Sequence, residues 1–219
     1  MTAIDDLELM RIQCETLYTY DANGRMLHSN EPGDVDAPRF FLGRTTLGNE
    51  WRFRHDVPDG LKAALERASA ESDDEIIKCA LPVGSVWSGP AYRFPDEIAA
   101  PTNVVRLSDD NREILRPHLN GWADDPTIAQ PAFGCVVDSR AVSICCSVRI
   151  GGRADEAGVE TAREFRGRGY AVPAIAAWAL AVRALGKIPI YSTSWDNLAS
   201  QAVARRLGLV QFGTDLSIG

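Results

Sequence analysis

The stretch that most constrains this chain is residues 158–171, which read Gly-Val-Glu-Thr-Ala-Arg-Glu-Phe-Arg-Gly-Arg-Gly-Tyr-Ala. A short β-prone run leads into two glycines, and Pro173 then opens an apolar segment that lasts until Gly186. Glycine adopts positive φ readily and lets a ligand approach the backbone, so Gly167 and Gly169 can direct successive N–H groups into one concavity. Proline suits the first turn of a helix, where free N–H groups carry the positive end of the helix dipole. The sequence therefore predicts a strand, a tight glycine loop and a helix N-terminus that together bind a phosphate.

Two arginines in the loop strengthen this prediction. Arg166 and Arg168 carry planar, permanently charged guanidinium groups that suit a diphosphate. The loop matches neither common nucleotide signature, because a Walker P-loop needs Lys-Ser or Lys-Thr after its second glycine and a dinucleotide fingerprint needs three glycines. Glycine-containing turns between a strand and a helix are also common without a ligand. An ordinary tight turn therefore stays open as the alternative.

The pattern Arg166-x-x-Gly169-x-Ala171 resembles the loop that binds the diphosphate of acyl-coenzyme A in the GNAT superfamily of N-acetyltransferases. Residues 188–208 resemble that family's next strand and the asparagine-initiated helix that follows it. Two ordered matches at the right separation are more specific than either one alone. The resemblance covers residues 103–219, about half of the chain.

The resemblance implies an α+β fold with a mixed, mostly antiparallel central sheet flanked by helices in the C-terminal half, preceded by a smaller α+β N-terminal half. It also implies an enzyme, an N-acetyltransferase that transfers the acetyl group of acetyl-CoA to a primary amine by direct nucleophilic attack, without a metal. The acceptor is a small-molecule or peptide amine, and its identity cannot be derived from the sequence. A non-enzymatic acyl-CoA-binding or regulatory module is the alternative function.

The same resemblance assigns residues to the cofactor. Backbone groups of Val159 and Thr161, on the strand before the loop, hold the pantetheine arm and polarise the thioester carbonyl. Asn197 and Ser200 contact the same arm from the last helix, although Asn197 also suits a plain helix cap. The loop supplies the remaining cofactor-binding residues, which are Arg166, Gly167, Arg168, Gly169, Tyr170 and Ala171.

The chemistry needs a base, because an amine attacks only in its neutral form, and it needs donors for the developing oxyanion. Glu156 and Glu160 are the nearest carboxylates, and residues four apart on a strand share a face. Glu160 is the preferred base because it lies closer to the expected thioester, while a solvent-facing or salt-bridged role for both stays open. Many family members carry a tyrosine seven residues after the asparagine to protonate the thiolate, but this chain has Ala204 there. Tyr191 is the candidate general acid in its place.

Composition limits the partners and the compartment. The net charge of −7 argues against a nucleic-acid binder. Five cysteines without metal-ligand spacing indicate a reduced, cytoplasmic protein, and the N-terminus lacks the features of a signal peptide. The longest apolar segment, 171–185, is too short to cross a membrane and contains Arg183. An RNA-associated role through Arg163, Arg166, Arg168, Arg205 and Arg206 is a minor alternative, and a homodimer is left open.

The chain is expected to form two domains. Residues 1–100 form an N-terminal α+β domain whose proline-rich and aromatic stretch, 81–101, serves as the connection. Residues 101–219 form the GNAT-like domain, with an early helix between 121 and 131 that the sequence does not place. The N-terminal part is predicted to contain a hairpin turning at 21–24, a second hairpin from 40–44 and 50–55, and a helix capped by Asp59. The predicted elements of the second domain are strand 104–107, helix 109–119, hairpin 130–138 with 141–150, strand 156–161, helix 173–185, strand 188–192, a helix from Asp196 or Asn197 to Gly208, and strand 210–212.

Overall fold

The computed structural model describes residues 4–70, 72–125 and 128–219. The chain divides into two units, one formed by residues 1–90 with 212–219 and the other by residues 91–211. The division at residue 90 lies inside the stretch 81–101, for which the sequence predicts a connection. The C-terminal segment, which was expected to belong to a domain spanning 101–219, groups with the first unit instead.

The first unit is built on antiparallel strands. Strand β3 pairs with β4 on one side and with the C-terminal half of β11 on the other, with Leu42 opposite both Trp51 and Leu216. This pairing explains why the C-terminal segment belongs to the first unit. The elements of this unit in chain order are α1 (Asp6–Leu17), β1 (Tyr18–Tyr20), β2 (Met26–Ser29), β3 (Phe40–Thr45), β4 (Gly48–Phe53), α2 (Asp59–Ala68), α3 (Asp73–Cys79), the start of β5 (Val86–Arg93) and the end of β11 (Val210–Ile218).

Both hairpins predicted for the N-terminal part are confirmed, and so is the helix near Asp59, but Asp59 does not cap it: Pro58 is the N-cap residue and Asp59 is the first residue of α2. Helices α1 and α3 were not predicted. Helix α1 begins where the Asp5 side chain accepts a hydrogen bond from the Glu8 backbone N–H at 2.8 Å, and it buries Met10 and Ile12. Its sequence is ambiguous because the apolar residues are followed directly by the β-prone run Tyr-Thr-Tyr of β1.

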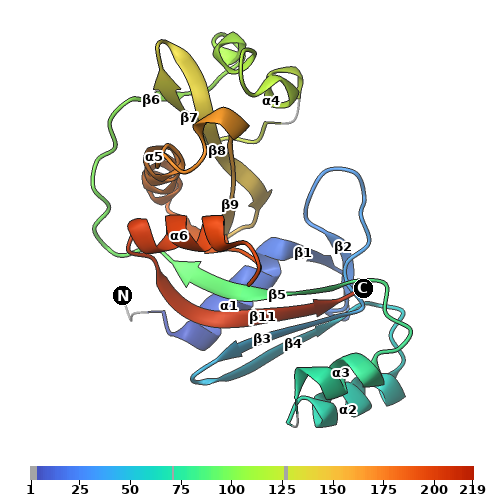
Figure 1. Cartoon of the computed structure of the whole chain (residues 1–219). Helices are drawn as coiled ribbons and strands as arrows, with labels where there is room; N and C mark the ends of the chain where they lie inside the picture. Colours follow the sequence, from blue (N-terminus) through green and yellow to red (C-terminus); the bar gives the residue numbers. More distant parts are fainter. Residues whose placement is uncertain (1–3, 71, 126–127) are drawn as a thin grey trace. The chain divides into compact units, whose positions relative to one another are not determined.

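The second unit contains both stretches that resemble the GNAT superfamily, the loop 166–171 and residues 188–208. Its elements, drawn from green through yellow to red in Figure 1, are the end of β5, β6 (Val104–Arg106), the short 3₁₀ helix η1 (Arg112–Leu115), α4 (Asn120–Asp124), β7 (Ala132–Val137), β8 (Arg140–Ile150), β9 (Ala154–Thr161), the 3₁₀ turn η2 (Arg163–Phe165), α5 (Ala171–Ala184), β10 (Ile188–Ser192), α6 (Leu198–Arg206) and the start of β11.

The strands of this unit form a mixed sheet. Antiparallel pairing joins β6 to β7, β7 to β8 and β8 to β9, whereas β9 and β10 run parallel. Strand β10 then pairs antiparallel with residues 91–93 of β5. The described strands of this sheet are therefore mostly antiparallel, as expected, and β9 and β10 form a parallel pair within it.

Each face of this sheet has its own core. Helix α5 covers one face, where Trp178 is fully buried among Cys145, Ala157 and Tyr191. On the opposite face, η1 and α4 lie over a second core that contains Leu115, Ala123, Ile144 and Cys146. Cys145 and Cys146 thus point to opposite faces, as adjacent residues of a strand must. No helix in the described part of the chain is long and apolar enough to span a bilayer.

The prediction of one helix over 109–119 is wrong. The structure instead has the single turn η1, a break, and then α4. Pro117 explains the break, because proline lacks the backbone N–H that a continuing helix needs and its ring clashes with the preceding turn. Helix α4 supplies the early helix that the sequence did not place. Helix α5 begins at Ala171, so Pro173 lies in its first turn, where the missing N–H costs nothing.

A buried polar network crosses the core under α5. The Trp178 indole Nε1 donates a hydrogen bond to Ser147 Oγ at 3.0 Å, and Ser147 Oγ donates to Asp155 Oδ2 at 3.0 Å. The Lys187 ammonium reaches the other carboxylate oxygen, Asp155 Oδ1, at 2.9 Å. Asp155 lies on β9 opposite Pro189 of β10, so this network fixes the place where the two parallel strands pair.

Candidate functional site

Strands β9 and β10 pair over a short distance only. Within the described residues, β10 pairs with β9 from Ala154 to Glu156, while β9 continues along β8 as far as Thr161. The Ala162 N–H donates to the Val142 carbonyl oxygen at 3.0 Å, so the backbone groups of Ala162 point toward β8. In an antiparallel pair, the backbone N–H and C=O groups of successive residues point alternately toward the partner strand and away from it. The peptide groups of Val159 and Thr161 therefore point away from β8, toward the side on which β10 no longer pairs with β9.

The loop after β9 has the geometry that its glycines predict. Gly167 has φ of +77° and Gly169 has φ of +89°, both in the region that favours glycine. Helix α5 follows directly, and no side chain of the described residues caps it, because its N-cap residue Tyr170 makes no side-chain hydrogen bond there. A Cβ added at Gly167 would meet no atom within 4 Å, so this side of the loop is open. An anion can therefore reach the helix N-terminus.

Four exposed arginines lie in or beside this loop, three in the loop itself and one, Arg206, at the end of α6. Arg166 Nε donates to the Thr161 carbonyl oxygen at 3.0 Å, which ties the loop back to β9. The Arg168 guanidinium lies 5.6 Å from the centre of the Phe165 ring. None of the four forms an ion pair with a carboxylate in the parts of the chain that the structure describes, whereas many other arginines do, as Arg54 does with Asp56 at 2.8 Å. The four are Arg163, Arg166, Arg168 and Arg206.

Glu160 is exposed on β9, on the face that α4 covers. The Trp122 indole Nε1 donates to Glu160 Oε2 at 2.6 Å, while Oε1 has no hydrogen-bond partner among the described residues. Nearby, His118 and Glu164 meet at 2.8 Å between Nδ1 and Oε1. The pKa of Glu164 is held below its usual range, first by its own backbone N–H and then by His118. One oxygen of Glu160 is thus oriented by α4, and the other can accept a proton from a bound molecule.

The second glutamate considered from the sequence lies in a different environment. Glu156 is only 3% exposed, and its carboxylate accepts hydrogen bonds from Arg149 Nη1 at 2.5 Å and from Ser192 Oγ at 2.6 Å. Both carboxylate oxygens of Glu156 are thus engaged within the protein and out of reach of a bound substrate. The structure therefore favours Glu160 over Glu156 as the reachable carboxylate.

A third group of candidate residues connects β10 to α6. The buried Tyr191 hydroxyl lies 2.6 Å from Ser200 Oγ, and the Ser200 N–H donates to Asn197 Oδ1 at 3.1 Å. Asn197 therefore caps α6, as its position suggested. Burial raises the pKa of Tyr191 to about 12, so this hydroxyl keeps its proton. Ala204, where many family members have tyrosine, is fully buried against the α5 core.

Two features of the site were not found from the sequence as site residues. Trp122 was missed because it lies 38 residues before Glu160 and no helix had been placed around it. Arg206 was noted only as part of a basic pair, yet a Cβ at Gly169 would lie 3.3 Å from its Nη1. The adjacent arginines Arg205 and Arg206 were a sequence signal that could have pointed to Arg206. No comparable signal in the sequence marks Trp122.

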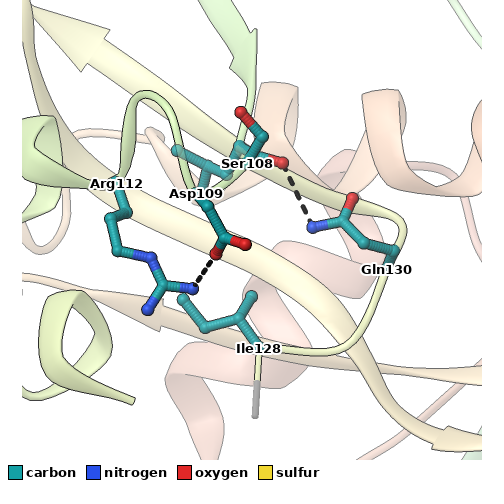
Figure 2. A pocket seen from close by; sticks show the side chains of 6 residues that line it. Ser108, Asp109, Arg112, Ile128 and Gln130 are labelled. Carbon is teal, nitrogen blue, oxygen red and sulfur yellow. Dashed lines mark hydrogen bonds and ion pairs between the residues drawn. The ribbon is translucent and has the colours of Figure 1, made fainter. Parts of the chain in front are cut away.

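A separate pocket of about 260 Å³ opens beside the end of β6. Figure 2 shows that its polar side chains are largely engaged: Arg112 Nη2 donates to Asp109 at 2.6 Å, and Gln130 Nε2 donates to the Leu107 carbonyl at 3.1 Å. None of the candidate site residues lines it. The lining residues are Leu107, Ser108, Asp109, Arg112, Ile128 and Gln130.

Comparison with solved structures identifies the fold. The structure of a GCN5-related N-acetyltransferase from Kribbella flavida matches with a TM-score of 0.53 and 15% identity, covering 100% of this chain and 96% of that one. A GNAT-family acetyltransferase from Colwellia psychrerythraea matches with a TM-score of 0.52 and 10% identity over 77% of this chain and 75% of that one. A GNAT-family protein from Novosphingobium aromaticivorans matches with a TM-score of 0.50 and 18% identity over 62% of this chain. The chain spans 65% of the length of that third protein, less than two thirds of it.

These likenesses show that the chain has a GNAT-like fold, at identities of 10–18%. The resemblance noted in the sequence is therefore confirmed at the level of the fold. No family model matches the sequence, and a search of curated proteins finds no similar sequence.

Proposed function

We propose that this chain is an acetyl-CoA-dependent N-acetyltransferase that transfers the acetyl group to a primary amine by direct attack. The observation that carries this proposal is the group of four exposed arginines, without ion pairs among the described residues, in or beside the loop that leads into the N-terminus of α5. The names of the structural neighbours from Kribbella flavida and Colwellia psychrerythraea agree with it. All five cysteines are free, which supports a reducing compartment such as the cytoplasm.

In this proposal the coenzyme diphosphate lies on the loop and on the first turn of α5. The backbone N–H groups of residues 167–171 donate to the phosphate oxygens, and Arg166 and Arg168 add bidentate donors. The positive φ of Gly167 and Gly169 supports this role, because it lets successive N–H groups face one side. The hydrogen bond from Arg166 to Thr161 holds the loop against the strand that carries the rest of the coenzyme.

The pantetheine arm and the thioester extend along the free edge of β9. The Val159 and Thr161 peptide groups point to this side, so they can hydrogen-bond the arm and donate to the oxygen that becomes negative during attack. Asn197 and Ser200 contribute from the start of α6, where Ser200 Oγ is within reach of Tyr191.

Glu160 acts as the base. The amine nitrogen forms a bond with the acetyl carbonyl carbon, its proton passes to Glu160 directly or through a water molecule, and the bond between carbon and sulfur breaks. The coenzyme leaves as a thiolate, so the charges balance. Trp122 holds Glu160 Oε2 and leaves Oε1 facing the acceptor. Glu156 remains a structural member of its ion pair.

The thiolate cannot be protonated by a tyrosine seven residues after Asn197, because this chain has Ala204 at that position. Tyr191 has a pKa of about 12, well above that of a thiol near 8.5, so it does not give up its proton readily. Its place behind Ser200 suits a hydrogen bond that stabilises the thiolate through the serine hydroxyl. The proton can then come from solvent after the thiolate has departed.

Calorimetric titration of the full chain with acetyl-CoA tests this proposal, with desacetyl-CoA and ADP as controls. We expect micromolar binding that requires the pantetheine arm. Arg166→Glu should weaken this binding by about 10-fold or more, because it places a negative charge at the diphosphate. Absence of acetyl-CoA binding to the unmodified chain would remove the basis of the proposed function.

The second candidate is a non-enzymatic acyl-CoA-binding or regulatory module. It is favoured by Ala204 and by the raised pKa of Tyr191, since together they leave the site without a ready proton donor. Tight acetyl-CoA binding, with no acetyl transfer to a broad panel of primary amines, would select this candidate over the enzyme.

A further inference from the structure

Residues 118–124, which end in α4, contact the end of β9 and the turn η2 at two points with the same spacing. The Trp122 indole Nε1 donates to Glu160 Oε2 at 2.6 Å. Four residues before Trp122, His118 Nδ1 lies 2.8 Å from Oε1 of Glu164, which is four residues after Glu160. The two segments therefore run in opposite directions along this contact, and two hydrogen bonds join them.

The hydrogen bond between His118 and Glu164 has a defined direction. The pKa of Glu164 is held below its usual range, first by its own backbone N–H and then by His118, so the carboxylate is ionised at neutral pH. An ionised carboxylate only accepts hydrogen bonds, so Nδ1 of His118 is the donor. The His118 ring also packs edge-on against Phe165, with ring centres 4.8 Å apart and planes at 74°. A charge-assisted hydrogen bond and an aromatic contact together fix the orientation of this ring.

Helix α4 depends on such contacts for its position. It has only five residues, and Leu119 at its N-cap makes no side-chain hydrogen bond to it. Isolated helices shorter than about 12–15 residues are marginal in water, so tertiary contacts decide where α4 lies. Arg116 also donates to Asn120 at 3.2 Å and to Asp124 at 2.8 Å, but it belongs to the adjoining turn and does not join α4 to β9. His118 ties the start of the segment to the residues that follow β9.

The ordinary role of an exposed ion pair does not set His118 and Glu164 apart. Such pairs contribute little to the stability of a fold, and here the two side chains are 26% and 56% exposed. Their place in the chain is what distinguishes them. The histidine lies one helical turn before the tryptophan that holds one oxygen of Glu160, and the glutamate lies on the segment that continues from Glu160.

We propose that His118 is a positioning residue for acetyl transfer and acts through Trp122. By holding the start of the segment against η2, it keeps the indole N–H on Glu160 Oε2 and leaves Oε1 facing the acceptor. This inference rests on the proposed function, in which Glu160 is the base. Loss of the His118 hydrogen bond should lower turnover and spare acetyl-CoA affinity, because Arg166 still ties the loop to β9.

Two substitutions of His118 separate its hydrogen bond from its ring. His118→Phe keeps a ring against Phe165 and removes the Nδ1 donor, whereas His118→Asn loses the ring and keeps an N–H donor near the position of Nδ1. Turnover is measured as thiol release from acetyl-CoA with a panel of primary amines. We expect His118→Phe to lower kcat by about 3- to 10-fold, with the KM for acetyl-CoA changed by less than about 2-fold. His118→Asn should recover most of the lost turnover.

A double variant tests whether His118 acts through Trp122. In Trp122→Phe the hydrogen bond to Glu160 is already absent, so adding His118→Phe should lower kcat no further. A double variant whose loss equals the product of the two separate losses would overturn this route.

A second pair of the same kind supplies the matched control. His28 lies 3.7 Å from Asp36 in the first unit, and His28→Phe should leave kcat unchanged. Amide hydrogen exchange adds a readout that needs no activity. The Trp122 and Ala123 N–H groups donate to the Leu119 carbonyl oxygen, and their exchange should be faster in His118→Phe than in the unmodified chain and in His118→Asn.

The outcomes separate this inference from the function on which it rests. Unchanged kcat in His118→Phe, or unchanged exchange at Trp122 and Ala123, would overturn the role of His118 and leave the acetyltransferase intact. Absence of acetyl transfer by the unmodified chain would refute the proposed function and, with it, the part that Glu160 plays as base.

Discussion

Replacing Lys187 by methionine should destabilise the second unit strongly. Lys187 pairs with Asp155, whose carboxylate is only 1% exposed and also accepts a hydrogen bond from Ser147. Loss of the ammonium would leave a buried carboxylate without its countercharge, and breaking a buried pair in this way costs about 3–5 kcal/mol. The Lys187 side chain is 23% exposed and Ser147 continues to donate, so we expect about 2–4 kcal/mol here.

Urea unfolding followed by far-ultraviolet circular dichroism measures this loss as a change in the free energy of unfolding. In a chain of this size, a loss of about 3 kcal/mol corresponds to a fall in Tm of roughly 6–12 °C. Lys78→Met is the matched control, because the Lys78 side chain is 66% exposed and pairs with Glu75 on a helix surface. That control should change the free energy by less than about 0.5 kcal/mol.

A double variant makes the reasoning refutable. Asp155→Asn in the Lys187→Met background removes the uncompensated charge, so the double variant should be more stable than Lys187→Met alone. A loss below about 1 kcal/mol in the single variant, or no recovery in the double variant, would show that the carboxylate is not buried as a charged group between β9 and β10.

Three further predictions concern the site and the strand that leads to it. Glu160→Gln should lower turnover, measured by thiol release, by about 100-fold or more while the affinity for acetyl-CoA stays nearly constant. Trp122→Phe should lower turnover less, because it removes only the hydrogen bond to Glu160. Full activity in Glu160→Gln would exclude Glu160 as the base. Gly158→Ala should cost about 1–3 kcal/mol because its Cβ would overlap Val148 Cγ1, and Val148→Ala in the same chain should restore part of that loss in urea unfolding. Burial raises the pKa of Tyr191 to about 12 from 10, so its contribution to stability is complete below pH 10 and is lost as the pH rises toward 12. Tyr191→Phe should therefore unfold with a weaker dependence on pH between 10 and 12, and an unchanged dependence would contradict the burial of that hydroxyl.

The loop and its flanking elements could be predicted from the sequence because their signals are local. Gly167, Gly169 and Pro173 specify backbone conformations that act over a few residues, and the structure has them in a turn and in the first helical turn. A local signal also argued against the predicted helix over 109–119, because Pro117 cannot continue a helix. That error came from weighing the apolar spacing above the proline.

The rest of the site depends on contacts between distant residues, which no local pattern specifies. Trp122 meets Glu160 only because α4 lies over the end of β9, and Arg206 meets Gly169 only because α6 returns to the loop. The opposite environments of Glu156 and Glu160 likewise arise from Arg149 on β8, which reaches one carboxylate and not the other. Sequence spacing places both glutamates on one face but does not say which one solvent can reach.

The pairing of β3 with β11 has a consequence for the order in which the chain can fold during its synthesis. Residues 40–44 pair early with β4 along one edge, but along the other edge they find their partners only at residues 214–218, after the whole of the second unit has been synthesised. The first unit is therefore the first of the two to be made and the last to be completed, because one edge of β3 stays unpaired while some 170 residues are added. Phe40 and Leu42 share a core with Leu216 and Ile218 of β11, so this core stays incomplete and the free edge of β3 is open to wrong pairing until β11 is made.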